Sequence, residues 1–281
     1  MVSGIVLLDK EEGMTSRKVD NLIGKMFLSK KVGHLGTLDP FATGLLLLAV
    51  GKATKFLPYL DSSFKTYVAS LSLGVKTDTG DKDGKPVSSK SVPVLKKEKI
   101  DSALASFLGK SSQIPPMSSA IKIDGVPLYR LAHEGKERER APREIEIRGI
   151  RCLSFDGSCL EFEAEVSSGT YVRTLGEDIA EKLGTVGHLT SLRRVKVGEI
   201  PVEKAKRLSE LEERDFLPPS LFLSVERVPL GKGLIPEVKN GKKILLEGTH
   251  EEEVALMDGE EALAIYQKGE DGLYHCKRGL F

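Results

Sequence analysis

The chain contains 281 residues, of which 40% are hydrophobic and 30% are charged. This composition is typical of a globular protein, not a disordered one, and the length allows one large domain or two unequal domains. The longest apolar run, Leu45 to Val50, is far shorter than the roughly 18–20 residues that span a bilayer. No secretory signal pattern opens the chain, and its three cysteines form no CxxC motif. We therefore expect a cytoplasmic protein with no disulfide framework, zinc ribbon or membrane partner.

The charge of the chain is balanced in total and uneven in distribution. Lysine and arginine number 42 against 41 aspartates and glutamates, and the resulting net charge of +1 argues by itself against a nucleic-acid partner. Residues 251–261, however, contain six acidic and no basic side chains, so that the rest of the chain carries +7, with clusters such as Arg193-Arg194-Lys196. Two interpretations remain open: solvated faces of mixed charge, or a basic body that could hold a polyanion.

The first predicted element is a helix. Ser16 is a plausible N-cap, and apolar residues follow at helical spacing: Val19, Leu22, Ile23, Met26 and Phe27. Residues 32–44 are polar and glycine-rich, with neither a helical nor a strand period. They lead into an apolar strand over 45–50.

Two later segments alternate as half-buried strands do. Tyr67, Ala69, Leu71 and Leu73 share one face, and every second residue of 160–166 is apolar. A helix is expected over roughly 97–108, ending at Gly109, and another over 172–183, stopped by Gly184. Because both strands have a polar face, we predict an α+β fold built on a largely antiparallel mixed sheet with flanking helices.

Two regions differ in composition from the rest. Residues 113–146 begin with Pro-Pro, include a short helix around 128–134 and end in dense alternating charge, which indicates an insertion. From residue 229 the chain consists of short strands separated by glycine, which predicts a small β-domain over 229–281 after a larger domain over 1–228.

Asp39 is the first candidate for chemistry. It lies in GHLGTLDP, where Pro40 favours an extended conformation at Asp39, so that its carboxylate could project into a cleft as a nucleophile. An aspartate that caps its own turn is the alternative. Glycoside hydrolysis would require a second carboxylate, and the sequence offers several without fixing their positions: Asp78, Asp81, Asp83, Glu177 and Asp178.

Arg173 follows a predicted strand-to-helix junction, where a guanidinium can hold a carboxylate or phosphate. A surface ion pair with Glu177, four residues on, is the alternative. Tyr67 and Tyr171 could be core residues or platforms on which a base stacks. The histidines and cysteines have no metal-ligand spacing, and phosphate-binding glycine motifs are absent from the sequence. We expect no metal and no cofactor.

Five segments, in order, resemble the tRNA pseudouridine synthases of the TruB type, which act on the T-loop uridine at position 55 of tRNA. The segments are LLDKEEGMTS, VGHLGTLDPFATGLLLLAVGKATK, KTYVASLSLGVKTDTGDKDG, PPMSSAIKIDGVPLYRLAHEGKERERAPR and SSGTYVRTLGEDIAEKLGTVGHLTSLRRVKVG. The resemblance runs from residue 5 to about residue 200. Glu11 stands where the family usually has proline, which affects only the local stiffness of the backbone. The resemblance implies that 113–146 contacts RNA and that 229–281 is a PUA-like RNA-binding domain.

Three residues correspond to the catalytic group of the family. Asp39 matches the catalytic aspartate, and Arg173 matches the arginine that pairs with it. Tyr67 matches the tyrosine that stacks on the target uracil and lies close enough to take part in proton transfer. A neighbouring guanidinium would lower the pKa of the Asp39 carboxyl and favour its charged form.

Four further residues correspond to parts of the RNA site. Tyr171 and Leu192 match residues that line the uridine pocket. His34 matches the histidine that enters the T-loop and helps to hold the target base out of its stack. Lys10 matches a lysine near the site.

The implied reaction breaks the bond between C1′ and N1, turns the uracil and rejoins it through C5, which requires no cofactor. The aspartate could attack uracil C6, add to ribose C1′ or abstract a sugar proton. We expect a monomer whose partner is the T-arm of tRNA. Three other functions remain open: an RNA-binding or tRNA-folding protein without catalysis, a nucleoside glycosidase, and the guide-RNA-dependent pseudouridine synthase of archaea and eukaryotes.

Overall fold

The computed structural model describes residues 2–119, 121–123, 125–136 and 138–280, and in this part of the chain nine strands form one large sheet. Hydrogen-bonded neighbours follow the order β1-β3-β12-β4-β11-β10-β7, while β2 pairs with β3 and β13 with β12. The strands are β1 (Gly4–Lys10), β2 (Val32–Leu35), β3 (Thr43–Val50), β4 (Phe64–Leu73), β7 (Gly109–Gln113), β10 (Arg143–Phe155), β11 (Cys159–Ser167), β12 (Gly187–Val197) and β13 (Ile200–Pro201). Their pairings are antiparallel except for a short parallel contact between β3 and β12. The predicted mixed, largely antiparallel sheet is confirmed.

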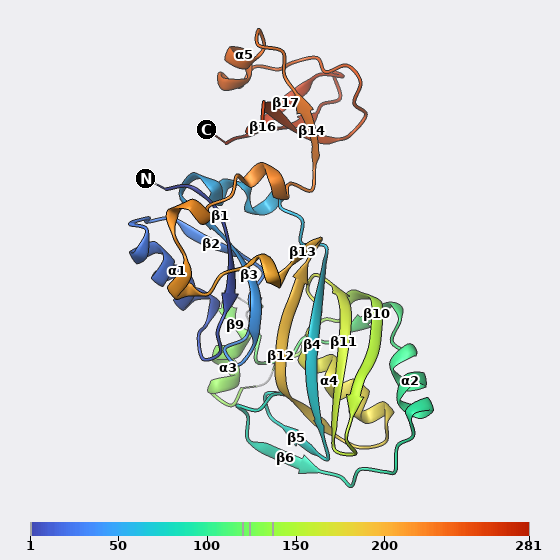
Figure 1. Cartoon of the computed structure of the whole chain (residues 1–281). Helices are drawn as coiled ribbons and strands as arrows, with labels where there is room; N and C mark the ends of the chain where they lie inside the picture. Colours follow the sequence, from blue (N-terminus) through green and yellow to red (C-terminus); the bar gives the residue numbers. More distant parts are fainter. Residues whose placement is uncertain (1, 120, 124, 137, 281) are drawn as a thin grey trace.

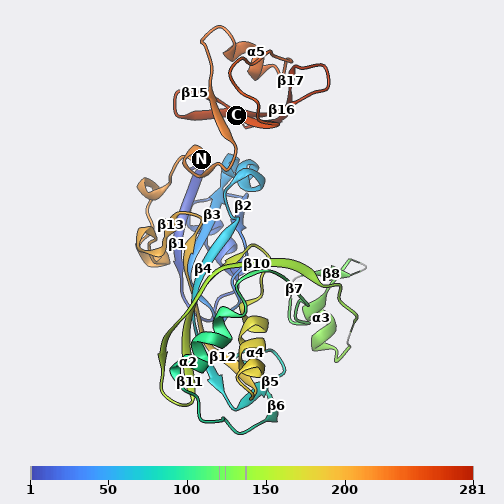
Figure 2. The ribbon, with the colours of Figure 1, turned by 90° about the vertical axis from the view of Figure 1, so that its right-hand side faces the viewer.

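Burial on one face of the sheet explains why the central strands form. Side chains of β4 and β11 alternate between buried and partly exposed positions along both strands. The buried face packs against α2 (Lys97–Ala105) and α4 (Val172–Lys182), which lie side by side on it (Figure 2). Ile179 of α4 and Phe162 of β11 are both fully buried in this core. Helix α1 (Ser16–Met26) inserts Val19 and Ile23 into the same core from the other end of the sheet.

Three local predictions were wrong. Thr15, not Ser16, caps α1, because the Thr15 hydroxyl accepts the Lys18 N–H at 3.0 Å while Ser16 already lies in the helix. A short strand, β2, lies within residues 32–44, where its four residues are too few and too polar to show a period. Helix α2 ends at Ala105 instead of 108, since the N–H groups of Phe107 and Leu108 bond to carbonyls three positions back, not four.

A segment corresponding to the predicted insertion leaves the sheet at one point. Strands β7 and β10 pair with Gln113 opposite Arg143, so the chain between them forms an excursion. It contains β8 (Lys122–Ile123), β9 (Val126–Pro127) and α3 (Leu128–His133), which project beside the main sheet (Figure 2). A second excursion, the hairpin of β5 (Val75–Thr77) and β6 (Pro86–Ser89), extends from the end of β4 (Figure 1).

The edge of the sheet at β1 is covered by the chain between the sheet and the C-terminal strands. Ile5 and Leu217 exchange two backbone hydrogen bonds of 2.8 and 2.9 Å, and the Lys206 N–H donates to the Leu7 carbonyl at 3.1 Å. These contacts block further strand pairing at that edge. Short 3₁₀ helices in the described ranges are η1 (Gly51–Tyr59), η2 (Val202–Lys204), η3 (Leu208–Glu210), η4 (Glu213–Asp215) and η5 (Pro219–Phe222).

A small β-domain lies at one end of the molecule, as the glycine-punctuated sequence predicts (Figure 1). Among the described residues four strands form its sheet, with one short helix: β14 (Glu226–Pro229), β15 (Glu253–Asp258), β16 (Glu261–Lys268), β17 (Tyr274–Gly279) and α5 (Ile235–Lys239). Tyr266 and Tyr274 are buried in its own core, while Ala255 and Ile265 pack with Phe56 of the larger domain. No helix in the described part of the chain is long and apolar enough to span a membrane.

Candidate active site

Asp39 lies on the loop between β2 and β3, and buried hydrogen bonds to the segment 13–16 hold that loop in place. The Ser16 hydroxyl accepts the Leu38 N–H at 2.9 Å and lies 3.2 Å from the Leu38 carbonyl. The Gly13 N–H donates to the Pro40 carbonyl at 2.8 Å. These bonds satisfy the backbone on both sides of Asp39, so the carboxylate is presented from a fixed turn.

The same loop is held from the side by Arg194 of β12, which is fully buried. Its guanidinium donates to three backbone carbonyls, those of Leu45 at 2.7 Å, Thr37 at 3.3 Å and Gly36 at 3.2 Å. Gly44 is essential to this arrangement, because a Cβ there would lie 2.3 Å from the Arg194 carbonyl oxygen and φ is +101°. The loop that carries Asp39 is therefore held in place at the point where β3 pairs with β12.

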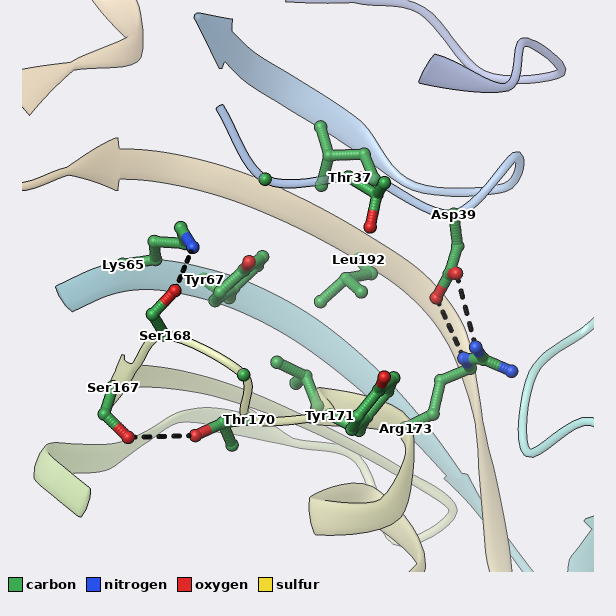
Figure 3. A pocket seen from close by; sticks show the side chains of 14 residues that line it. Thr37, Asp39, Lys65, Tyr67, Ser167, Ser168, Thr170, Tyr171, Arg173 and Leu192 are labelled. Carbon is green, nitrogen blue, oxygen red and sulfur yellow. Dashed lines mark hydrogen bonds and ion pairs between the residues drawn. The ribbon is translucent and has the colours of Figure 1, made fainter. Parts of the chain in front are cut away.

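Arg173, in the first turn of α4, holds the Asp39 carboxylate in a two-pronged contact (Figure 3). Its Nε lies 2.9 Å from Asp39 Oδ2, and its Nη2 donates to Oδ1 at 3.2 Å. The rest of the guanidinium contacts Asp81 Oδ2 at 3.4 Å, the Thr79 carbonyl at 2.8 Å and the Ser118 carbonyl at 3.0 Å. With the Arg173 side chain only 4% exposed, these partners fix its orientation as well as its charge.

Asp81 is the one carboxylate, among the glycosidase candidates, that joins this site. Its side chain is 8% exposed and is held by the Thr79 hydroxyl at 2.6 Å. Asp78 instead accepts the Lys85 N–H at 2.8 Å within the same turn. Glu177 pairs with a lysine, Lys76, at 3.3 Å, so the surface pair of Arg173 with Glu177 was a wrong alternative. The polar turn between β5 and β6 therefore holds the Arg173 guanidinium in place.

A pocket of about 240 Å³ opens beside Asp39 and Arg173. Tyr67 of β4, Leu192 of β12 and Tyr171 line it, together with the loop that precedes α4 (Figure 3). Both sides of the Tyr171 backbone are fixed by one side chain, because Gln113 accepts its N–H at 2.8 Å and donates to its carbonyl at 3.1 Å. The pocket is smaller than the roughly 300–1,000 Å³ of typical ligand sites, a size that suits a single base.

Two predicted residues do not line the pocket. Lys10 is 1% exposed and lies behind the loop, where its ammonium donates to the carbonyls of Met14 at 2.7 Å and Pro40 at 3.4 Å. His34 lies on β2, just before the loop, and its Nδ1 is 3.0 Å from both carboxylate oxygens of Asp20. The His34 side chain is 18% exposed, so part of the ring still reaches the surface.

The pKa of Asp39 departs from the expected direction. Burial raises it and is the largest influence; Arg173 opposes that effect, and the nearby Asp81 adds to it. The expectation of a lowered pKa was therefore wrong, because it considered the ion pair without the burial. Burial also lowers the pKa of Lys10 to about 8, against the attraction of Asp39.

Sequence reasoning missed several residues that build this site. Lys65 lines the pocket, Gln113 fixes Tyr171, and Arg194 clamps the loop. A signal existed for Lys65, because it lies two residues before Tyr67 and therefore belongs to the same buried face of β4. No cluster of three or more histidine, cysteine, aspartate or glutamate side chains that could hold a metal occurs in the described ranges.

Comparison with known proteins shows the family of this chain. Residues 25–172 match the family model for TruB family pseudouridylate synthase (N terminal domain), and residues 173–217 match that for the tRNA pseudouridylate synthase B C-terminal domain. A tRNA pseudouridine synthase B of Hydrogenovibrio crunogenus is 47% identical over 75% of this chain and 70% of its own. One of Francisella philomiragia is 38% identical over 95% of this chain and 92% of its own.

A solved structure has a similar fold. The crystal structure of a Cbf5-Nop10-Gar1 complex contains a chain with a TM-score of 0.76 and 24% identity, covering 99% of this chain and 85% of that one. At this identity the likeness concerns the fold alone. The sequence matches carry the assignment, and they confirm the resemblance drawn from the five segments: the chain belongs to the TruB family of pseudouridylate synthases.

Proposed function

We propose that this chain converts the T-loop uridine at position 55 of tRNA to pseudouridine, with Asp39 as its catalytic residue. The observation that carries the proposal is the two-pronged contact of Arg173 with Asp39 at the mouth of a base-sized pocket lined by Tyr67 and Leu192. A carboxylate held in this way has one orientation toward whatever enters the pocket.

The reaction balances without a cofactor. The bond between C1′ and N1 breaks, the uracil turns, and a bond between C1′ and C5 forms. The hydrogen on C5 leaves as a proton, and N1, which has lost its bond to the sugar, takes up a proton. Asp39 acts in its ionised form whether it attacks C6, adds to C1′ or abstracts a sugar proton. Its raised pKa makes it a stronger base than an exposed aspartate. Tyr67 is placed to stack on the uracil and to take part in the proton transfer.

The target base must leave its stack to reach this pocket. Unstacking costs a few kcal/mol, which stacking on Tyr67 offsets in part. His34, on the strand that leads into the Asp39 loop, then enters the space that the base vacates, a role supported by its partly exposed ring. Tyr171 and Leu192 then bound the base, while Lys10 fixes the loop from behind.

The RNA partner is the T-arm stem-loop, recognised more by shape and stacking than by long phosphate contacts. We assign residues 1–228 to catalysis, with 113–146 contacting RNA, and residues 229–281 to a PUA-like RNA-binding domain. The acidic residues 251–261 lie in that small domain, so the remaining +7 belongs to the rest of the chain. The protein acts as a monomer in the cytoplasm.

Tritium release from tRNA labelled at uridine C5 tests the proposal. Wild type should release tritium, and mass spectrometry should locate pseudouridine at position 55. Asp39→Asn should release none while still binding the tRNA, because the change removes the charge and keeps the shape. Asp156→Asn, at an exposed position between β10 and β11, is the matched control and should be as active as wild type. Full activity of Asp39→Asn would refute the assignment.

The same assay separates the other functions. A nucleoside glycosidase would release free uracil, whereas the proposed enzyme releases none. A guide-dependent synthase would be inactive on an unmodified tRNA transcript without guide RNA and partner proteins. A protein that only folds tRNA would assist refolding without releasing tritium.

A further inference from the structure

Lys65 is the one charged residue on the buried face of β4. Tyr67, Ala69, Leu71 and Leu73 follow it on the same buried face. Lys65 itself is only 7% exposed, and it lines the pocket with Tyr67. Burying an ammonium group is costly unless a partner compensates for the lost water. A lysine at this point of a core strand therefore indicates a specific acceptor.

The described part of the protein supplies only one such acceptor. Lys65 Nζ donates to the Ser168 hydroxyl at 3.0 Å and makes no ion pair within the described residues. Its charged neighbour is another cation, Arg194, and burial together with that repulsion lowers the pKa of Lys65 to about 8. Lys65 therefore remains mostly protonated at neutral pH, with donor capacity that the protein leaves unused.

The backbone is shaped to let this ammonium reach the pocket. Gly36 has a φ of +74°, and a Cβ there would lie 3.1 Å from Lys65 Nζ and 3.3 Å from its Cε. Lys65 and Ser168 lie at one end of the pocket, and Asp39 with Arg173 lies at the other, with Tyr67 and Leu192 between them (Figure 3). The pocket thus has a carboxylate end and a donor end.

We propose that Lys65, with Ser168, donates a hydrogen bond to O4 of the flipped uracil and so selects uracil over cytosine. This inference rests on the proposed function. Each step open to Asp39 involves C6, C1′ or a sugar proton, all of which lie on the N1 side of the nucleotide. When that side faces Asp39, O4 lies across the ring from N1 and points to the donor end.

The contact between Lys65 and a carbonyl oxygen of the base is preserved when the base rotates during the reaction. Rotation about the axis through C6 and N3 exchanges N1 with C5 and also exchanges O4 with O2. A carbonyl oxygen therefore faces Lys65 both before the C1′–N1 bond breaks and after the C1′–C5 bond forms. Cytosine has an amino group in place of O4, and two donors that face each other cannot bond. A site of this kind rejects the wrong base strongly, because its buried donor is left without a partner.

A double-mutant cycle between protein and RNA tests the contact. The proteins carry Asp39→Asn so that bound uridine is not converted, and they contain either Lys65 or Lys65→Met. The T-arm hairpins carry uracil, cytosine or 2-pyrimidinone, which lacks O4, at the target position. We expect loss of O4 or loss of the ammonium to weaken binding by about 10- to 100-fold. We expect the two losses together to weaken binding no more than either alone.

Lys196→Met provides the matched control. Lys196 lies on β12 opposite Thr66, in a groove on the other face of the sheet, and pairs with Glu199 at 2.9 Å. Its removal takes away one positive charge and should leave the preference for uracil over cytosine intact. Thermal melting of each protein variant monitors its folding. If Lys65→Met proves unstable, the 2-pyrimidinone hairpin still tests the contact, because it removes O4 while the protein keeps Lys65.

Two results would overturn the proposal. If the losses of binding free energy caused by Lys65→Met and by removal of O4 add up when the two changes are combined, Lys65 does not contact O4. Equal weakening of the uracil and cytosine hairpins, with a salt slope reduced by about one, would mean that Lys65 binds a phosphate instead. Failure of the proposed function looks different, because tritium release from tRNA by wild type would then be absent whatever the hairpin affinities.

Discussion

Replacing Arg173 with lysine tests whether the orientation of Asp39 matters beyond the charge beside it. The guanidinium holds both Asp39 oxygens and also reaches Asp81, the Thr79 carbonyl and the Ser118 carbonyl. A lysine keeps the positive charge but presents three donors from one point, so it cannot reproduce the two-pronged contact while serving the other partners.

The structure sets the size of the expected loss. At least one of the two contacts to Asp39 disappears, and a hydrogen bond to a charged group contributes about 1.5–3 kcal/mol. If the contact is needed in the transition state, the single-turnover rate of Arg173→Lys should fall by about 10- to 150-fold. The affinity for tRNA should change little, because Arg173 is buried beside the carboxylate.

Single-turnover tritium release, together with filter binding of the same tRNA, measures the two quantities separately. Arg151→Lys is the matched control, since Arg151 pairs with Glu163 at 2.8 Å on an exposed part of the sheet and is 67% exposed. It should retain the wild-type rate. A rate for Arg173→Lys within threefold of wild type would refute the reasoning, because charge alone would then suffice. A parallel loss of rate and of melting temperature would point to folding instead.

Two further predictions concern the pH profile and the loop clamp. Burial raises the pKa of Asp39, so acid should protonate this carboxylate at a higher pH than the pKa of roughly 3.9 of a free aspartate. The single-turnover rate should therefore fall as the pH is lowered through the raised pKa. A rate that stays constant down to pH 4 would contradict this. Gly44→Ala should destabilise the protein by about 3 kcal/mol in urea unfolding, because its Cβ would collide with the Arg194 carbonyl. Gly157→Ala, also at positive φ but with no atom within 4 Å, should cost clearly less.

The central strands could be predicted from the sequence because one face of each is buried. Burial of every second residue leaves a period of two, which is visible in β4 and β11 without any knowledge of their partners. Strand β2 left no such trace, because its four residues include Gly33 and His34 and three of the four are only partly buried. Its place is set by pairing with β3, a long-range contact that a local pattern does not contain.

The charge clusters show the same limit. Arg193, Arg194 and Lys196 are neighbours in sequence and suggest one basic surface. In the structure Arg193 pairs with Asp9 at 2.8 Å, Arg194 is fully buried, and Lys196 pairs with Glu199. Alternation along β12 separates Arg193 from Arg194, and an irregularity in the pairing with β4 separates Arg194 from Lys196. The partner of each charge is then set by the three-dimensional structure, which the local sequence does not contain.

The meeting of Asp39 and Arg173 was implied by the family resemblance and not by spacing. The two residues are 134 positions apart, and each had an ordinary local explanation: a turn for Asp39 and a helix-surface ion pair for Arg173. Asp81 was one of five possible second carboxylates, and nothing in its turn distinguished it from Asp78. The contact that distinguishes it is made by Arg173, from another element.

The position of the site follows from an irregularity in the sheet. Strands β3 and β12 pair in parallel over only two positions, and Gly44 lets the backbone of β12 approach there. The loop just before β3 leaves carbonyl groups without strand partners, and Arg194 and Lys10 satisfy several of them. The buried Lys10 ammonium also attracts the Asp39 carboxylate, which lowers the pKa of Asp39 and offsets part of the effect of burial. A sheet continued regularly through this point would have satisfied its own carbonyls, and it would have left neither the space for a base nor a reason for the Lys10 ammonium to lie beside the Asp39 loop.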